Sequence, residues 1–285
     1  MPIDYARLKN RPFQLLEHRY SQRDAILYAL GVGVGSDWLN EKELRFVYED
    51  GLMALPTFAS VLAYPGFWLR EADTGIDHTL VLHAEQELEI YRTLQPEGFV
   101  KARTEILDVV DKGPGKGAFI YSARTIRDAL TDEPLCRLRQ SSIARGQGGF
   151  GGAKHYPRLT RPVPDRAPDL VCELSTLPQA ALIYRLSGDF NPLHASPSVA
   201  RAAGFDRPIL HGMCTFGVAA YAVLKTCCDY DVERFRGISA RFSAPVFPGE
   251  TISTHLWEEA EGVAFSCWVH ERNQRVLDCG FVPLT

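Results

Sequence analysis

Apolar and polar residues alternate along most of the chain, a pattern typical of half-buried strands. In the first half it predicts strands over 78–94 and 99–128, with a turn at GPGKG (113–117), and a third over 135–152 that ends in glycines. In the second half it predicts shorter strands over 171–176, 235–247, 251–260, 263–272 and 274–284. The chain is therefore expected to be strand-rich and to build antiparallel sheet.

Two apolar segments lack this alternation and predict helices. One covers 52–64, with Pro56 near its start, and the other runs from Gly212 to Leu224 as a buried helix. The remaining predicted elements are an arm over 1–19, a helix that starts at Tyr20 and ends in glycines, and a strand over 44–48.

The order of elements recurs, which indicates duplication of one unit. The apolar segment 52–60 aligns with 210–219 and shares its Thr-Phe pair. A stretch with four prolines and little apolar periodicity separates the two copies. We therefore predict an N-terminal repeat over 1–152, a linker over 153–170 and a C-terminal repeat over 171–285.

Composition narrows the classes of function. The chain has 285 residues, 46% of them hydrophobic, which is enough for a large core. A net charge of −4 argues against nucleic-acid binding, and the longest apolar run is too short to cross a membrane. No secretory signal and no C-terminal SKL is present. The seven cysteines form no disulfide framework, so we expect free thiols and a cytoplasmic location, with a peroxisomal one left open.

The sequence YRLSGDFNPLH (184–194) gathers polar groups suited to proton transfer. It supplies the carboxylate of Asp189, the amide of Asn191 and the imidazole of His194. Pro192 lacks an amide hydrogen and restricts the residue before it, which predicts a fixed turn. Asp189 and His194 can then face each other.

We expect the segment after this turn to bring the chain back next to Asp189 and His194. Ser196 and Pro197 read as the cap and first residue of a short helix over 197–203. The sequence ILHG then sets His211 and Gly212 at the start of the buried helix. The first amides of a helix are unpaired and stabilise a developing oxyanion.

YRLSGDFNPLH followed by ILHG resembles the hydratase 2 motif of the MaoC-like, R-specific enoyl-CoA hydratases. The resemblance implies an α+β double hot-dog fold, in which two long central helices are each wrapped by an antiparallel sheet and the sheets merge side by side. It also implies a homodimer that reversibly hydrates (2E)-enoyl-CoA to (3R)-3-hydroxyacyl-CoA.

Each catalytic role in that reaction has a candidate residue. Asp189 and His194 would share the catalytic water, Asn191 would orient the water or the turn, and the Gly212 amide would bind the thioester oxygen. Aligned with the motif, the first repeat carries Met53-Ala54 and no matching histidine. We expect it to be a non-catalytic copy that binds the acyl chain.

The resemblance also nominates four residues that bind the substrate, namely His83, Ala84, Lys112 and Phe242. His211 is a further candidate, either as a substrate contact or as a residue that positions Gly212. The acyl tail is expected along apolar residues of the first repeat: Leu52, Met53, Leu55, Phe58, Leu62 and Phe67. Lys112 can offer its ammonium to a phosphate of coenzyme A. Coenzyme A enters as part of the substrate, and neither a metal nor a redox cofactor is implied.

Several alternatives remain open. The turn at Asp189 can be purely structural, and Asp189, His194 and His211 are residue types that also bind metals. Among enzymes, the rivals are a 3-hydroxyacyl thioester dehydratase acting on carrier-protein, branched or sterol-derived substrates, and a thioesterase. A non-catalytic acyl-CoA binding module is the rival of a different class.

Overall fold

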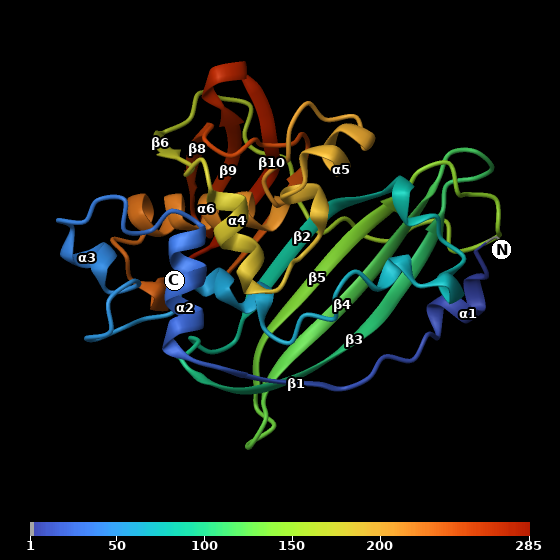
Figure 1. Ribbon diagram of the computed structural model, residues 1–285, viewed down its shortest axis with the longest axis horizontal. Helices are drawn as coiled ribbons and strands as arrows, with labels where there is room; N and C mark the ends of the chain where they lie inside the picture. Colours follow the sequence, from blue (N-terminus) through green and yellow to red (C-terminus); the bar gives the residue numbers. More distant parts are fainter. Residues whose placement is uncertain (1–2) are drawn as a thin grey trace.

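The computed structural model describes residues 3–285, and a single curved antiparallel sheet dominates it (Figure 1). The sheet has ten strands in the order β1-β3-β4-β5-β2-β7-β10-β9-β8-β6. The first half contributes β1 (Leu16–Tyr20), β2 (Val81–Ile90), β3 (Gly98–Asp111), β4 (Ala118–Asp128) and β5 (Pro134–Ala144). The second half contributes β6 (Leu170–Ser175), β7 (Gly237–Phe242), β8 (Thr251–Glu259), β9 (Gly262–Val269) and β10 (Gln274–Pro283).

The two halves join edge to edge in the middle of this sheet. Strand β2 pairs with β7 in antiparallel register, from Glu85 opposite Arg241 to Glu89 opposite Gly237. Every strand before this seam in the sheet order comes from the first half, and every strand after it from the second. The merged double hot dog predicted from the sequence is confirmed.

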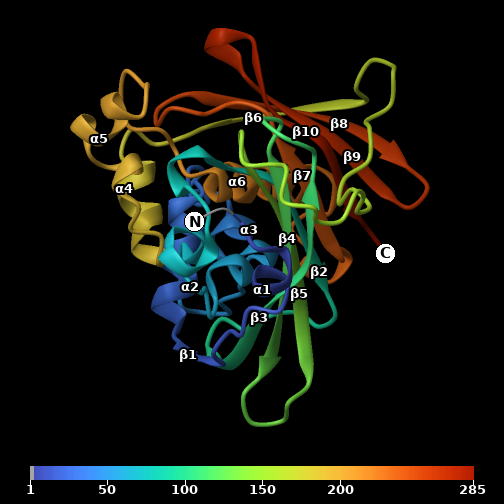
Figure 2. The same ribbon diagram turned by 90° about the vertical axis from the view of Figure 1, so that its right-hand side faces the viewer.

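One long helix, α6 (Gly212–Cys227), lies in the concave side of the sheet. Its residues from Cys214 to Leu224 are all buried, because the segment is apolar around its whole circumference. Gly217 lets α2 approach, since a Cβ there would lie 2.6 Å from Val32 Cγ1. Figure 2 shows α2, α4 and α6 together on this side.

The remaining helices are short. The α-helices are α1 (Tyr5–Lys9), α2 (Gln22–Gly31), α3 (Glu41–Leu44), α4 (Ala180–Tyr184) and α5 (Pro197–Ala202). The 3₁₀ turns are η1 (Pro56–Val61), η2 (Trp68–Arg70), η3 (Ala72–Thr74), η4 (His78–Leu80), η5 (Arg185–Ser187), η6 (Pro192–His194), η7 (Val232–Arg234) and η8 (His270–Arg272). The helices predicted from Tyr20, over 197–203 and from Gly212 are confirmed.

Two local predictions were wrong, and a third was incomplete. The helix expected over 52–64 is the six-residue 3₁₀ turn η1, which ends before Ala63 at a positive φ of 45°, so the first half lacks a long central helix. The strand expected over 44–48 is a turn that follows α3, with Phe46 buried in the core. The arm expected over 1–19 contains α1 and the edge strand β1, whose short alternating sequence LEHRY pairs with β3.

The segment predicted as a linker has little regular structure and runs along the outer face of the sheet. Ala153 bridges to Val110, and the ring of Tyr156 lies with its centroid 4.3 Å from that of Tyr121. Thr160 donates a hydrogen bond to the buried carboxylate of Glu85 (2.7 Å). All seven cysteines are free, as predicted. No helix within residues 3–285 is long and apolar enough to cross a membrane.

Candidate active site

The turn that carries Asp189 is held by its own side chains. Gly188 has a positive φ of 118°, which reverses the chain after η5 at low cost for a glycine. Asp189 Oδ1 accepts a hydrogen bond from the backbone N–H of Asn191 (3.2 Å), and Asn191 Oδ1 accepts one from the backbone N–H of Leu193 (3.1 Å). Asn191 therefore caps η6 and fixes where His194 leaves the backbone.

The protonation of His194 follows from its contacts. Its Nδ1 lies 2.9 Å from the Ile209 carbonyl oxygen, which can only accept, so Nδ1–H is the donor. Nε2 then carries the lone pair. Burial lowers the pKa of His194 below its usual 6.5, although the Ile209 carbonyl and Asp189 oppose this effect. His194 is therefore a neutral base with a defined free nitrogen at neutral pH.

His211 forms a layer beneath His194. The two rings stack with centroids 3.8 Å apart, and His211 Nε2–H donates to the Asp189 carbonyl oxygen (3.2 Å). Burial, followed by the nearby His194, lowers the pKa of His211 to about 3. The ring is only 1% exposed and does not line the cavity. It ties the start of α6 to the Asp189 turn.

Asp189, His194 and His211 each bring one polar atom into a small space, within 4.8 Å of one another. A carboxylate oxygen and an imidazole nitrogen at this separation can be bridged by one water. A metal ion would need the lone pairs of both rings to converge on it. The planes of the stacked rings are inclined by only 28°, so their lone pairs run side by side. The cluster suits proton transfer better than metal binding.

Gly212 begins α6 and opens the same space. Its amide is the first of the helix and has no acceptor within the helix. A Cβ at this position would lie 3.2 Å from a carbon of the Phe242 ring, so glycine allows the aromatic ring to cover the helix start. The Phe242 ring in turn contacts the ring of His83, with centroids 4.5 Å apart.

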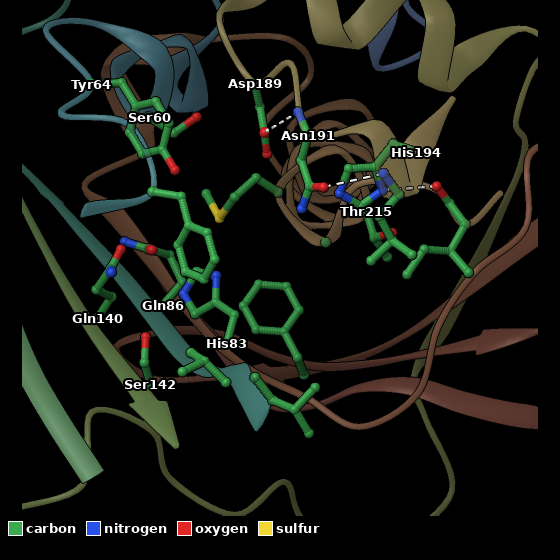
Figure 3. Close-up of a pocket in the computed structure, with 18 of the residues that line it drawn as sticks. Ser60, Tyr64, His83, Gln86, Gln140, Ser142, Asp189, Asn191, His194 and Thr215 are labelled. Atoms are coloured by element: carbon green, nitrogen blue, oxygen red, sulfur yellow. Dashed lines mark hydrogen bonds between the residues drawn. The ribbon is translucent and has the colours of Figure 1, made fainter. Parts of the chain in front are cut away.

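These residues border one cavity of about 620 Å³. Figure 3 shows Asp189, Asn191 and His194 on one side, with His83, Gln86, Gln140 and Ser142 across from them. The cavity is therefore lined by both halves of the chain: the motif side chains come from the second half and the facing wall from the first. The predicted residues Asp189, Asn191, His194, Gly212, His83 and Phe242 all line it.

Three nominated residues do not line this cavity: His211, described above, Ala84 and Lys112. Ala84 lies in β2, where the pairing of β2 with β5 is irregular. Lys112 is exposed directly after β3, and its Nζ lies 5.9 Å from the centroid of the Phe119 ring. Of the six apolar residues expected along the acyl tail, only Phe67 is in the wall. Of the other five, Leu52 is buried outside the main core cluster, and four pack in or against that core: Met53, Leu55, Phe58 and Leu62.

Models of two protein families together match most of the chain. The MFE-2 hydratase 2 N-terminal domain matches residues 18–146, and the MaoC like domain matches 160–276. The chain is 40% identical to "Enoyl-CoA hydratase 2, peroxisomal" of Arabidopsis thaliana, over 94% of this chain and 91% of that protein. It is also 40% identical to "Enoyl-CoA hydratase ChsH3" of Mycobacterium tuberculosis, over 98% of both.

The chain belongs to the MaoC-like hydratase 2 family. A solved structure of a MaoC-like dehydratase from Phytophthora capsici superposes with a TM-score of 0.88 at 34% identity, covering 99% of this chain and 98% of that one. The fold is shared more widely. A Mycobacterium tuberculosis protein described as a double hot dog superposes at 15% identity with a TM-score of 0.60, over 99% of this chain and 98% of that one.

The cavity also holds a group of polar residues that the sequence did not nominate. The cavity wall of the first half carries Thr104, Ser122, Arg124, Gln140 and Ser142. Polar residues two apart, as in Ser122/Arg124 and Gln140/Ser142, are typical of the solvent side of a strand. The sequence did carry one sign of these residues: a pair of polar residues with this spacing occurs on each of two successive predicted strands.

Proposed function

We propose that the protein reversibly hydrates (2E)-enoyl-CoA to (3R)-3-hydroxyacyl-CoA, a hydro-lyase reaction of fatty acid β-oxidation. One observation carries the proposal: the Asp189 carboxylate and a ring nitrogen of the neutral His194 lie within 4.8 Å of each other, beside a helix N-terminus at a cavity wall. The names of the Arabidopsis and Mycobacterium relatives support the same chemistry.

In the proposed mechanism one water lies between Asp189 and His194. These two groups accept a proton from the water as its oxygen bonds to C3 of the enoyl thioester. Electron density moves through the double bond onto the thioester oxygen, where the Gly212 amide donates a hydrogen bond. A proton then passes to C2, so that the elements of one water have been added. The reverse sequence dehydrates the 3-hydroxyacyl thioester.

Binding of the rest of the substrate divides between the halves. We propose that His83 and Phe242 cover the thioester end, because the Phe242 ring lies against the start of α6 and the His83 ring packs on Phe242. Ala84 and the ammonium of Lys112 are proposed contacts of the coenzyme A arm outside the cavity. His211 acts through Asp189 and Gly212, which it holds together. Coenzyme A is part of the substrate, and the mechanism uses no other cofactor.

The same site disfavours a non-catalytic binding module. A module of that kind needs an apolar channel, whereas Asp189 and His194 place two groups that exchange protons next to the cavity. The homodimer and the cytoplasmic location stay predictions, and the word peroxisomal belongs to the name of the Arabidopsis relative.

Hydration of crotonyl-CoA and decenoyl-CoA, followed at the loss of enoyl absorbance, tests the proposal. Chiral analysis of the product should give the 3R alcohol. Asp189→Asn should keep acyl-CoA binding and lose hydration by about 10²-fold or more, since it removes a proton acceptor and preserves shape. No hydration of either substrate, or a 3S product, would contradict the proposal.

A further inference from the structure

The wall across the cavity from Asp189 is polar where an alkyl chain would need it to be apolar. It is built from neighbouring strands in register: Thr104 of β3 pairs with Arg124 of β4, and Ser122 of β4 pairs with Gln140 of β5. On the other side of Gln140 lies Gln86 of β2. The polar wall is thus one continuous patch of the concave face.

The patch has hydrogen-bonding capacity that the protein does not use. Within residues 3–285 no hydrogen bond reaches the hydroxyls of Thr104, Ser122 and Ser142 or the side-chain amide of Gln140. Thr104, Ser122 and Ser142 are 7%, 3% and 4% exposed, and all four residues line the cavity. Partners for these groups must come from within the cavity, as water or as bound ligand.

Arg124 adds a positive charge to the polar wall. It is 7% exposed and donates to the backbone oxygens of Ser60 (2.7 Å) and Ala63 (3.2 Å). Its Nε has no partner, and no carboxylate of residues 3–285 forms an ion pair with it. Burial lowers its pKa to about 10, so the side chain stays charged at neutral pH. A buried charge without a counter-charge is costly.

A plain alkyl chain is a poor occupant of such a wall. It would displace water from at least four groups and leave them unpaired, which is unfavourable for each group. An oxygen function on the chain would instead accept from Gln140, Ser122 or Arg124. Sites that hydrogen-bond one substrate group discriminate strongly against analogues that lack it.

We propose that the cavity selects acyl chains bearing an oxygen function remote from the thioester, a hydroxyl or a carboxylate. Arg124 makes the carboxylate the stronger of the two. The proposal rests on the proposed hydration activity and specifies its substrate class.

The test compares (2E)-enoyl-CoA substrates of matched length that end in a methyl, a hydroxyl or a carboxylate group, over a series of chain lengths. The measured quantity is the ratio of kcat/KM for each oxygenated substrate to that for its alkyl counterpart. We expect at least one ratio to exceed about tenfold in the natural protein. Ratios at or below one at every length would overturn the proposal.

Two variants locate the effect. Gln140→Leu keeps the side-chain volume and removes the amide group proposed to bind the oxygen function of the substrate. Arg124→Gln removes the positive charge. Gln140→Leu should lower both ratios about tenfold, and Arg124→Gln should act most on the carboxylate ratio. The matched control is Gln274→Leu, the same change at an exposed position of β10, which should leave the ratios unchanged.

The outcomes separate this inference from the proposed function. Each ratio compares two substrates on one protein. Partial unfolding of a variant lowers both kcat/KM values by the same factor and therefore leaves the ratio unchanged. If no substrate of any kind is hydrated, the proposed function fails. If alkyl substrates are hydrated well and Gln140→Leu leaves the ratios as they were, the proposed function stands and the polar wall has no part in selection.

Discussion

The lone pair on Nε2 of His194 is the feature on which the proposed chemistry depends. The Ile209 carbonyl fixes it by accepting from Nδ1–H, and the stacked His211 ring holds the imidazole from behind. Both contacts come from residues 209–211, so a second segment of the chain orients the His194 ring. A pair of rigidly placed acceptors has less reorganisation to undergo during proton transfer.

This assignment predicts a pH dependence. His194 must be unprotonated to accept a proton, and burial lowers its pKa below 6.5. The value of kcat/KM for hydration should therefore be level around neutral pH and fall on the acid side, with a midpoint below about 6.5. A pH–rate profile on crotonyl-CoA measures it. An increase in activity as the pH falls from about 6.5 to 5 would contradict the assignment.

Single residues were predictable where a motif constrains several of them together. Asp189, Asn191, His194 and Gly212 could be placed at one site because Pro192 and the HisGly pair limit how the chain can fold between them. Gln140 and Arg124 could not. Their side chains face the cavity because of the strand register and because the helices cover that face of the sheet, and neither feature can be predicted from the local sequence.

The elements show the same division. The bounds of α6 follow from the glycine at its start and an uninterrupted apolar run, and the alternating strands follow from their period. The segment 52–64 is as apolar as α6, but only six of its residues form the 3₁₀ turn η1. Apolarity predicted burial correctly there and helix length wrongly: the turn opens at Pro56 and is followed by Ala63 at a positive φ of 45°.

The contact between α6 and α2 predicts a cost for added volume. Gly217→Ala would place a Cβ 2.6 Å from Val32 Cγ1 and 2.9 Å from the Tyr28 hydroxyl, so these buried side chains or the backbone beneath them must shift. The free energy of unfolding should fall by about 1–3 kcal/mol, although alanine is the better helix former. Urea unfolding measures the difference. A variant as stable as the natural protein would show that the helices are not in close contact.

In the molecule as a whole, the seam between β2 and β7 puts one half of the chain opposite the other across the cavity. The second half carries Asp189 and His194, the proposed proton-transfer groups, and the first half carries most of the facing wall. The prediction that 1–152 and 171–285 are repeats with divided roles agrees with this arrangement and remains a prediction. The order of the strands was not predictable, since it depends on which sheet edges meet.

Building the site from buried histidines predicts sensitivity to acid. Burial lowers the pKa of His83 to about 4 and that of His211 to about 3. The unfolded chain, with histidine pKa values near 6.5, therefore binds more protons below about pH 6.5. The stability that these two groups contribute is complete above that pH and is lost as the pH falls, by about 1.4 kcal/mol per pH unit for each.

Urea unfolding of the natural protein and of His83→Phe, at steps between about pH 7 and 4.5, measures this slope. Carboxylates add to the slope in both proteins, so the difference isolates the histidine. The variant should lose about 1.4 kcal/mol less per pH unit over the acid part of the range. Equal slopes would mean that His83 is charged or solvated in the folded state.

The central claim is that Asp189 and His194 act together on one water. A double-mutant cycle on kcat/KM for one enoyl-CoA tests it directly, with Asp189→Asn, His194→Ala and both changes combined. Each single variant should lose about 10²- to 10⁴-fold, and the double variant should be little worse than the poorer single one, because either change already disables the shared unit. Losses that multiply in the double variant, or wild-type activity in either single one, would contradict the account.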